Sequence, residues 1–256
     1  MKVLDDVGQG TIDVFGYAGG VAELGAEAAS FIVRLRIRVG ETFDQAYLLG
    51  VQSWPIVILT SLFTGLVLAF ESAQQAVAYG AGGFVGGAVV YAAAREMGPL
   101  LTAIVVAGRV GAAIAAELGS MVVTEQIEAL QALGLSPTRM LVVPRLLALL
   151  VMVPLLTIMG EIVSIVAGAW MAYTTAHISY GSFIDSARAA VPFTDVLKGL
   201  LKSAVFGIVI ALVGSYQGLK TRNGAAGVGH STTAAVVTSI ILIFILNFGL
   251  SFVLYR

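Results

Sequence analysis

Five long apolar runs constrain this chain more than any other feature of its sequence. They cover about residues 52–72, 84–110, 146–176, 199–218 and 234–255. An α-helix rises about 1.5 Å per residue and needs about 20 residues to cross a hydrocarbon layer of about 30 Å. The runs are continuous rather than alternating, which disfavours a membrane β-barrel. The sequence therefore predicts an all-α integral membrane protein with five transmembrane helices.

The composition agrees with this class. Charged residues make up only 11% of the chain, against about 25% in a typical soluble domain. The net charge of -1 argues against nucleic acid, which needs a basic patch. The absence of cysteine excludes disulfides, thiolate metal sites and cysteine nucleophiles. The N-terminus has no apolar core of the kind that a signal peptide needs, so we expect it to be retained.

The basic residues favour a cytoplasmic N-terminus and a C-terminus on the outer side, because cytoplasmic loops carry an excess of Lys and Arg. With that orientation the larger basic set falls inside: Lys2, Arg34, Arg36, Arg38, Arg109, Arg139, Arg145, Lys220 and Arg222. The smaller set falls outside or near the outer side: Arg95, Arg188, Lys198, Lys202 and Arg256.

The first 45 or so residues are too polar to span a membrane. Residues 21–39, VAELGAEAASFIVRLRIRV, mix apolar residues with charges and end in arginines. We expect a helix that lies on the inner membrane face with its basic end near anionic headgroups; a soluble tail is the alternative. The predicted division is an interfacial segment, 1–45, and a transmembrane domain, 46–256.

The second apolar run carries the most information. Small residues recur every four positions at Ala107, Gly111, Ala115 and Gly119, a spacing that lets another helix pack closely. Earlier in the run, AAAREMGPLL (92–101) places Arg95 and Glu96 at membrane depth, where ionisable groups need a partner or water. Either they border a hydrated cavity or the outer interface, or the span begins after Pro99 and they lie in an external loop.

A short amphipathic helix is predicted after this run, within MVVTEQIEALQALGLSP (121–137). Thr124 is a candidate N-cap, acidic residues follow in the first turn, and Gly134 stands at the stop. The apolar side at helical spacing consists of Ile127, Leu130 and Leu133. The apolar side of so short a helix needs cover, either from the span ends of the same chain or from a partner.

Other charged residues have mainly structural interpretations. We expect Arg109 and Glu117 to pair with Glu161, with Arg145 or with a second protomer, and Glu161 to be paired or protonated. Snorkelling to headgroups is the expected role of Lys198 and Lys202, with attraction of a lipid phosphate as the alternative. His177 and His230 lack metal-ligand spacing, and no metal or catalytic site is predicted.

A longer block, beginning REMGPLLTAIVVAGRVGAAIAAELGSMVVTEQIEALQALGLSPTRM, resembles the signature region of the MlaE, or YrbE, family of ABC-transporter permeases. FTDVLKGLLKSAVFG (193–207) and GVGHSTTAAVV (227–237) resemble later motifs of that family. The resemblance covers about residues 51–256. It implies an interfacial helix followed by five membrane helices, assembled as a homodimer in a bacterial inner membrane.

The resemblance also implies partners and sites. It implies two copies of a cytoplasmic MlaF-like ATPase, which uses ATP and Mg²⁺, and a hexamer of MlaD-like MCE subunits that exchange phospholipid with the permease. Helix 124–134 would be the coupling helix that docks on the ATPase through Glu125, Ile127, Glu128, Leu130, Leu133 and Gly134. The implied lipid cavity is lined by Leu68, Phe70, Gln75, Tyr79, Arg95, Glu96 and Met97.

Two other function classes are weaker. No G-x-x-x-x-G-K-[ST] element is present, so nucleotide hydrolysis must come from another subunit. An intramembrane lipid-modifying enzyme would need clustered catalytic groups, but the carboxylates and histidines are scattered. An ion-coupled secondary transporter usually shows internal repeats, and none is clear here. The sequence gives neither the direction of transport nor the headgroup preference.

Overall fold

The computed structural model describes residues 2–35 and 37–256, without the side chains of residues 2–11, 13 and 14. Met1 and Arg36, the latter part of the orientation argument, lie outside the described residues. The described residues form helices and turns, with no β-strand. The all-α prediction is confirmed.

Five helical segments of the described chain are long and apolar enough to cross a membrane, as predicted. We call them spans one to five: Val39–Ala78, Gly82–Val123, Thr138–Ala176, Phe193–Leu219 and Gly224–Leu254. Span one contains α2 (Val39–Gln45) and α3 (Trp54–Ala78), and span two contains α4 (Val85–Ala92), α5 (Gly98–Val106) and α6 (Ala112–Val123). Span three contains α8 (Val143–Ala176), and spans four and five are α10 (Phe193–Leu219) and α11 (Gly224–Leu254).

Most of the helices are longer than the apolar runs that predicted them. Span two, with 42 residues, is about 60 Å long at about 1.5 Å per residue, twice the thickness of the hydrocarbon layer. Span one begins at Val39, well before residue 52, and continues through π-helical and 3₁₀ turns at 46–53. Hydropathy marks only the apolar part of a helix. The helix itself continues into polar sequence because its backbone hydrogen bonds do not depend on apolar side chains.

Spans two, three and four form the central core. Its largest fully buried apolar side chains include Ile114, Leu149, Phe206 and Ile210. The small-residue stripe Ala107, Gly111, Ala115 and Gly119 is buried throughout. An added Cβ on Gly214 of α10 would lie 3.1 Å from the Gly111 carbonyl, which shows how closely the two helices approach. The predicted packing role of the stripe is confirmed.

Spans one and three form a second close pair. A Cβ added to Gly65 of α3 would overlap the backbone carbonyl of Ser164 on α8. A Cβ added to Gly160 of α8 would lie 2.6 Å from the Ser61 hydroxyl. Small residues therefore let α3 lie directly against α8, the helix with which it makes its most extensive contact.

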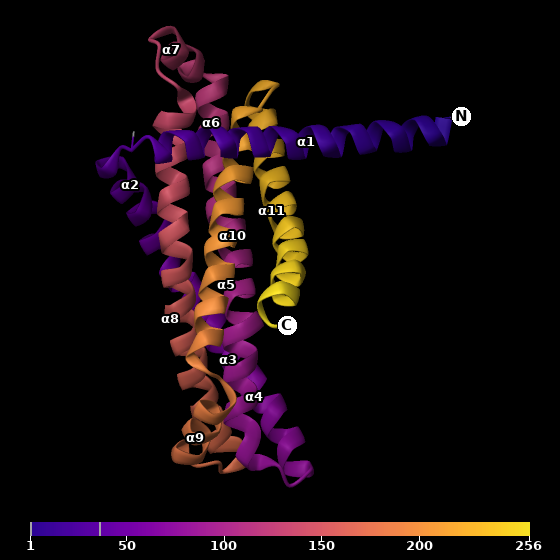
Figure 1. Ribbon diagram of the computed structural model, residues 1–256, viewed down its shortest axis with the longest axis vertical. Coiled ribbons are helices and arrows are strands. Elements are labelled where there is room, and N and C mark those ends of the chain that lie inside the picture. The colour runs from indigo at the N-terminus through magenta and orange to yellow at the C-terminus, as the bar shows by residue number, and fades with distance from the viewer. Residues whose placement is uncertain (1, 36) are drawn as a thin grey trace.

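Two short elements and one long helix mark the ends of the bundle. Helix α1 (Lys2–Val33) lies across one end, from which α7 (Gln126–Ala132) projects; we call this the proximal end (Figure 1). Helix α9 (Tyr180–Ala190) lies at the opposite, distal end (Figure 1). Whether α1 lies on a membrane surface stays a prediction, although its crossing direction suits that role.

Helix α1 is attached to the bundle by apolar and polar contacts. Leu24 and Ala28 pack in a cluster with Val142, Val143 and Tyr216. The Glu27 carboxylate accepts hydrogen bonds from the hydroxyl groups of Ser136, at 3.2 Å, and Thr138, at 2.8 Å. These contacts connect α1 directly to the segment that follows α7.

Candidate functional site

Arg95 and Glu96 lie inside span two, in a π-helical turn at Ala93–Met97. The helix continues without a break from Gly82 to Val123, so the two residues do not lie in a loop; their depth in the membrane stays a prediction. Pro99 occupies the first turn of α5, where its ring is tolerated. The π-helical turn leads into this proline, and the Gly98 N–H donates to the Ala93 carbonyl five residues earlier.

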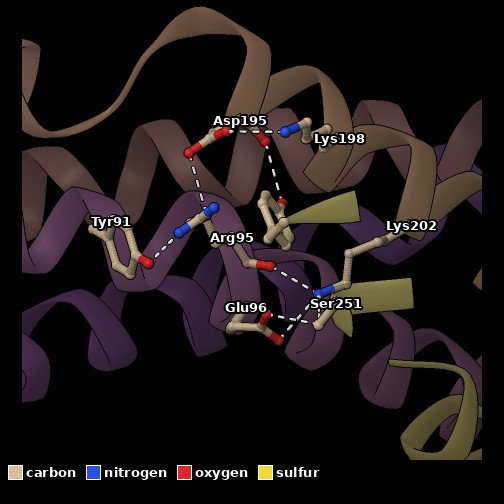
Figure 2. Close-up of polar contacts among 8 residues, drawn as sticks. Tyr91, Arg95, Glu96, Asp195, Lys198, Lys202 and Ser251 are labelled. Carbon is tan, nitrogen blue, oxygen red and sulfur yellow. Dashed lines mark hydrogen bonds and ion pairs between the residues drawn. The ribbon is translucent and has the colours of Figure 1, made fainter. Parts of the chain in front are cut away.

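The side chains around these two residues form a polar cluster drawn from three spans (Figure 2). We define the polar cluster as Tyr91, Arg95, Glu96, Asp195, Lys198, Lys202, Asn247, Ser251 and Tyr255. Span two supplies the first three residues, span four the next three, and the last three lie on span five or just after it.

Glu96 accepts hydrogen bonds from two other spans. Its carboxylate lies 3.0 Å from the Lys202 ammonium, 2.9 Å from the Asn247 amide nitrogen and 2.8 Å from the Ser251 hydroxyl. One cation and two neutral donors thus replace the water that a carboxylate would lose in an apolar layer. Glu96 is tolerable in the span because it is fully partnered.

Arg95 has a different set of partners. Its Nε lies 3.2 Å from the Asp195 carboxylate, and a terminal nitrogen contacts the Tyr91 hydroxyl. The guanidinium lies 3.9 Å from the centre of the Tyr255 ring, a cation–π distance. The Tyr255 hydroxyl donates to the Asp195 carbonyl at 3.3 Å. Burial raises the pKa of Tyr255 to about 12, so this hydroxyl keeps its proton at neutral pH.

Lys202 does not snorkel, and that prediction is wrong for this residue. Its side chain has no exposed surface, and its ammonium contacts Glu96, Ser251 and the Arg95 carbonyl. Helical sequence alone could not reveal that the side chain points between spans two and five. Lys198, one turn earlier, is about a third exposed and lies 3.7 Å from Asp195.

The remaining residues of the predicted lipid cavity do not share one face of α3. Leu68, Gln75 and Tyr79 are seven and eleven residues apart, close to whole numbers of turns, and share a face. Phe70 points to the other side, where it lines a hollow of about 590 Å³ with Thr175 and other residues near the distal end of α8. Met97 is 37% exposed on span two. Their contact with lipid stays a prediction.

The predicted short helix exists but begins later. Thr124 ends α6 and its hydroxyl donates to the Ser120 carbonyl at 2.9 Å, so the N-cap prediction is wrong. Span two continues through Val123, and Glu125, in a left-handed conformation, turns the chain into α7. Gly134 has φ +73°, a conformation that favours glycine, in agreement with its predicted place at the stop.

One side of α7 is only partly covered by this chain. Ile127 is buried, and Leu130 lines a hollow of about 290 Å³ that the Arg145 and Glu117 side chains also line. Leu133 is 74% exposed, and Glu125 and Glu128 are exposed as well. The ends of the spans therefore cover the first residue of the apolar side of α7, Ile127, and leave the last one, Leu133, exposed.

The other charged residues with predicted pairings behave differently from one another. Glu117 pairs with Arg145 at 2.7 Å, one of the predicted pairings. Arg109 instead donates to the Ser53 hydroxyl at 2.6 Å. Glu161 is buried, and its Oε1 has no hydrogen-bond partner among the described residues. Of the two expected states of Glu161, paired or protonated, the paired one has no support at Oε1 in the described chain, and the protonated one stays a prediction.

Comparison with known proteins decides the family. The model of the family described as Permease MlaE matches residues 42–253. The chain belongs to the MlaE permease family. It is accordingly a multi-pass membrane protein and a permease subunit of the ABC-transporter type.

Relatives of this permease carry matching descriptions. A probable ABC transporter permease protein of Synechocystis is 41% identical over 88% of this chain and 86% of its own length. One from Rickettsia typhi is 34% identical over 100% of this chain and 99% of its own length. The chloroplastic protein TRIGALACTOSYLDIACYLGLYCEROL 1 of Arabidopsis thaliana is 38% identical over 86% of this chain and 63% of its own length.

Sequence reasoning missed five members of the polar cluster in this permease. Tyr91 lies in the second apolar run, Asp195 lies just before the fourth, and Asn247, Ser251 and Tyr255 are spaced four apart on the last run. Polar side chains at helical spacing in an otherwise apolar run are a signal for contact with another polar helix. That signal could have predicted the role of span five but not its partners.

In the part of the chain that the structure describes, no group of three or more His, Asp or Glu side chains could hold a metal ion. His177 ends α8 in a left-handed conformation, and His230 lies near the start of α11.

Proposed function

We propose that this permease moves phospholipid as a homodimer, driven by two MlaF-like cytoplasmic ATPases and joined to a hexamer of MlaD-like MCE subunits. The chain itself is not an enzyme and carries no cofactor; ATP and Mg²⁺ are used by the ATPase. The setting is a bacterial inner membrane, with the proximal end in the cytoplasm and the C-terminus in the periplasm.

The observation that carries the proposal is the projecting helix α7. It stands beyond the spans at the proximal end (Figure 1), and Leu133 on its apolar side is 74% exposed. Leu133 continues the apolar side that begins with Ile127 and Leu130, on a segment that lies outside the spans, and this arrangement suits a protein partner. In a permease that hydrolyses no nucleotide, the ATPase is the partner that must receive this contact.

The structure also offers a route from α7 into the membrane. Helix α7 follows span two directly, and spans two and three flank it on either side in sequence. A displacement of α7 by closure of the ATPases would therefore act first on the ends of these two spans. We propose that their movement reshapes the lipid cavity, whose predicted lining includes Leu68, Phe70, Gln75, Tyr79, Arg95, Glu96 and Met97.

The docking proposal is tested with Leu133→Asp in the complex purified with its native neighbours. The exposed side chain makes the variant foldable, and the new charge should abolish co-purification of the ATPase and lipid-stimulated ATP hydrolysis. Leu35→Asp is the matched control, because Leu35 is 83% exposed outside α7. Intact co-purification and lipid-coupled turnover in Leu133→Asp would contradict the docking.

The lipid proposal is tested by placing a photoreactive amino acid at position 97. It should capture phospholipid within the assembled complex, and MCE subunits should be needed to release that lipid. Position 162 is the control, since Ile162 is 57% exposed on α8 and borders an apolar groove. Labelling of position 97 by bulk-lipid probes only, as at position 162, would count against a cavity there.

A further inference from the structure

Pro99 leaves a polar gap in span two. Proline has no N–H, so the carbonyl of Arg95, four residues earlier, lacks its α-helical donor. A carbonyl without a donor is strongly unfavourable in hydrocarbon, and such carbonyls in membrane helices are met by neighbouring groups. Here the Lys202 ammonium on span four lies 2.9 Å from the Arg95 carbonyl oxygen.

The same ammonium connects three spans. An ammonium group has three N–H donors, and that of Lys202 has three acceptors. These are the Arg95 carbonyl at 2.9 Å, the Glu96 carboxylate at 3.0 Å and the Ser251 hydroxyl at 2.9 Å. Spans two, four and five therefore meet at one fully buried nitrogen atom.

Span four comes close enough for this contact because of Gly199. A Cβ added there would overlap the carbonyl oxygen of Ala94, which belongs to the π-helical turn. Gly199 lies three residues before Lys202, on the same side of the helix. The glycine allows the close approach of the backbones, and the lysine then reaches the carbonyl next to the one that the glycine faces.

The last part of span five has few buried contacts besides this one, since Leu246 and Leu250 are only partly buried against the core. Its buried residues are Ala235, Ser239 and Ile243, and none of the described residues after Ile243 is buried. In that last stretch the polar contacts are made by Asn247, Ser251 and Tyr255, four residues apart and facing spans two and four.

We propose that Lys202 is a positioning residue that takes the place of the amide proton missing at Pro99 and, through the same ammonium, holds the distal halves of spans two, four and five together as one unit. The proposal rests on the proposed function, in which the lipid path changes shape when ATP binds. Span one, which meets span three through small residues, then moves against this unit.

The first test is a mutant cycle on the thermal stability of the purified complex. Glu96→Gln/Lys202→Met removes both charges and leaves the Arg95 carbonyl without its donor, so the midpoint of unfolding should fall. Adding Pro99→Ala restores an N–H at position 99 and should recover much of that loss, whereas Pro99→Ala alone should bring no gain. If Pro99→Ala changed the midpoint of unfolding equally in the wild-type chain and in the Glu96→Gln/Lys202→Met variant, the proposal that the Lys202 ammonium replaces the missing N–H donor would be wrong.

Lys198→Met is the matched control for this cycle. Lys198 lies one turn before Lys202 and pairs with Asp195 rather than with the Arg95 carbonyl. Pro99→Ala should therefore have the same effect with and without Lys198→Met. A rescue of Lys198→Met by Pro99→Ala would show a general effect of removing proline and would contradict the specific role of Lys202.

The second test measures whether the three spans move together. The chain has no cysteine, so spin labels can be placed without background at Leu201 and Phe248, both exposed residues of spans four and five. A second pair joins Leu201 to Phe63, an exposed residue of span one. Pulsed electron paramagnetic resonance is recorded in nanodiscs with the ATPase, with labelled chain diluted by unlabelled chain, before and after trapping with ATP and vanadate.

The 201–248 distance should stay narrow and unchanged on trapping, and it should broaden in Lys202→Met. The 63–201 distance should shift on trapping. A nucleotide-dependent 201–248 distance, or one unaffected by Lys202→Met, would overturn the proposal. If 201–248 behaves as expected but 63–201 never shifts, the positioning role of Lys202 stands and the proposed ATP-driven movement fails.

Discussion

Glu96 and Glu161 are carboxyl groups on neighbouring spans that lie near the same π-helical turn, yet their surroundings are opposite. Glu96 belongs to the turn and is partnered by Lys202, Asn247 and Ser251. Glu161 faces Gly98 at the end of the turn, and its Oε1 has no partner in the described chain. Two residues apart on a helix, positions 96 and 98 point in roughly opposite directions.

The difference teaches what an acidic residue in a membrane span can do. A carboxylate with a buried cation and two neutral donors fixes the position of three helices, because separating the charges in hydrocarbon is unfavourable. A carboxyl without a partner fixes nothing. Membrane depth and residue type are the same for both, so neither property alone reveals a role.

Glu96→Gln should have the largest effect on this comparison. It leaves the fully buried Lys202 ammonium without its counter-charge. Breaking a buried ion pair costs about 3–5 kcal/mol, and we expect the lower end of that range because the Glu96 side chain is 37% exposed. Unfolding of the purified chain by a denaturing detergent measures the loss. Glu71→Gln, at an exposed carboxyl on span one, is the control and should change the unfolding free energy little. A similarly small change for Glu96→Gln would contradict the inference that Glu96 holds the three spans in place.

Gly98→Ala should have an intermediate effect on the Glu161 side. The added methyl group would lie 2.7 Å from the Ala93 carbonyl and 2.9 Å from Glu161 Oε1. Overpacking of this kind costs about 1–3 kcal/mol. Gly108→Ala is the control in the same span, because a Cβ there meets nothing within 4 Å. Equal stability of the two variants in the same assay would mean that Glu161 of span three is not packed tightly against Gly98.

Glu161→Gln should have the smallest effect. The amide has nearly the shape of the carboxyl, and Glu161 Oε1 has no hydrogen-bond partner among the described residues to lose, so the change in unfolding free energy should stay within about 1 kcal/mol. The same substitution is thus expected to lower the stability much more at position 96 than at position 161 in one assay. A loss at Glu161 as large as that at Glu96 would point to a charged partner from a second copy of the chain.

Much of the fold could be predicted from sequence, and the reasons are local. The five apolar runs gave the number of spans because backbone groups in hydrocarbon leave helices as the only continuous solution for such runs. The stripe from Ala107 to Gly119 predicted close packing, and Gly134 predicted the stop of α7. The predicted starts of the helices were less accurate. Spans one and five begin at Val39 and Gly224, because the polar sequence before their apolar runs is also helical.

The candidate site was predicted less completely for a different reason. Arg95 and Glu96 were recognised as unusual from their depth, and Glu117–Arg145 was among the pairings considered. Lys202 was assigned to the membrane surface, since the direction of a lysine side chain depends on which helix lies beside it. Thr124 was assigned to a helix start because its sequence suits a cap, whereas the continuing span makes it a helix end.

The sequence by itself determined that this protein is a five-span helical permease of the MlaE family, because apolar length and motif order are properties of the chain in one dimension. Only the tertiary structure decided which buried charges are partnered. Partnership depends on how the spans rotate against one another, and residues 96, 202 and 251 are brought together by that packing alone. A carbonyl freed by a proline in one helix and met by a lysine of another is a contact that no single helix specifies.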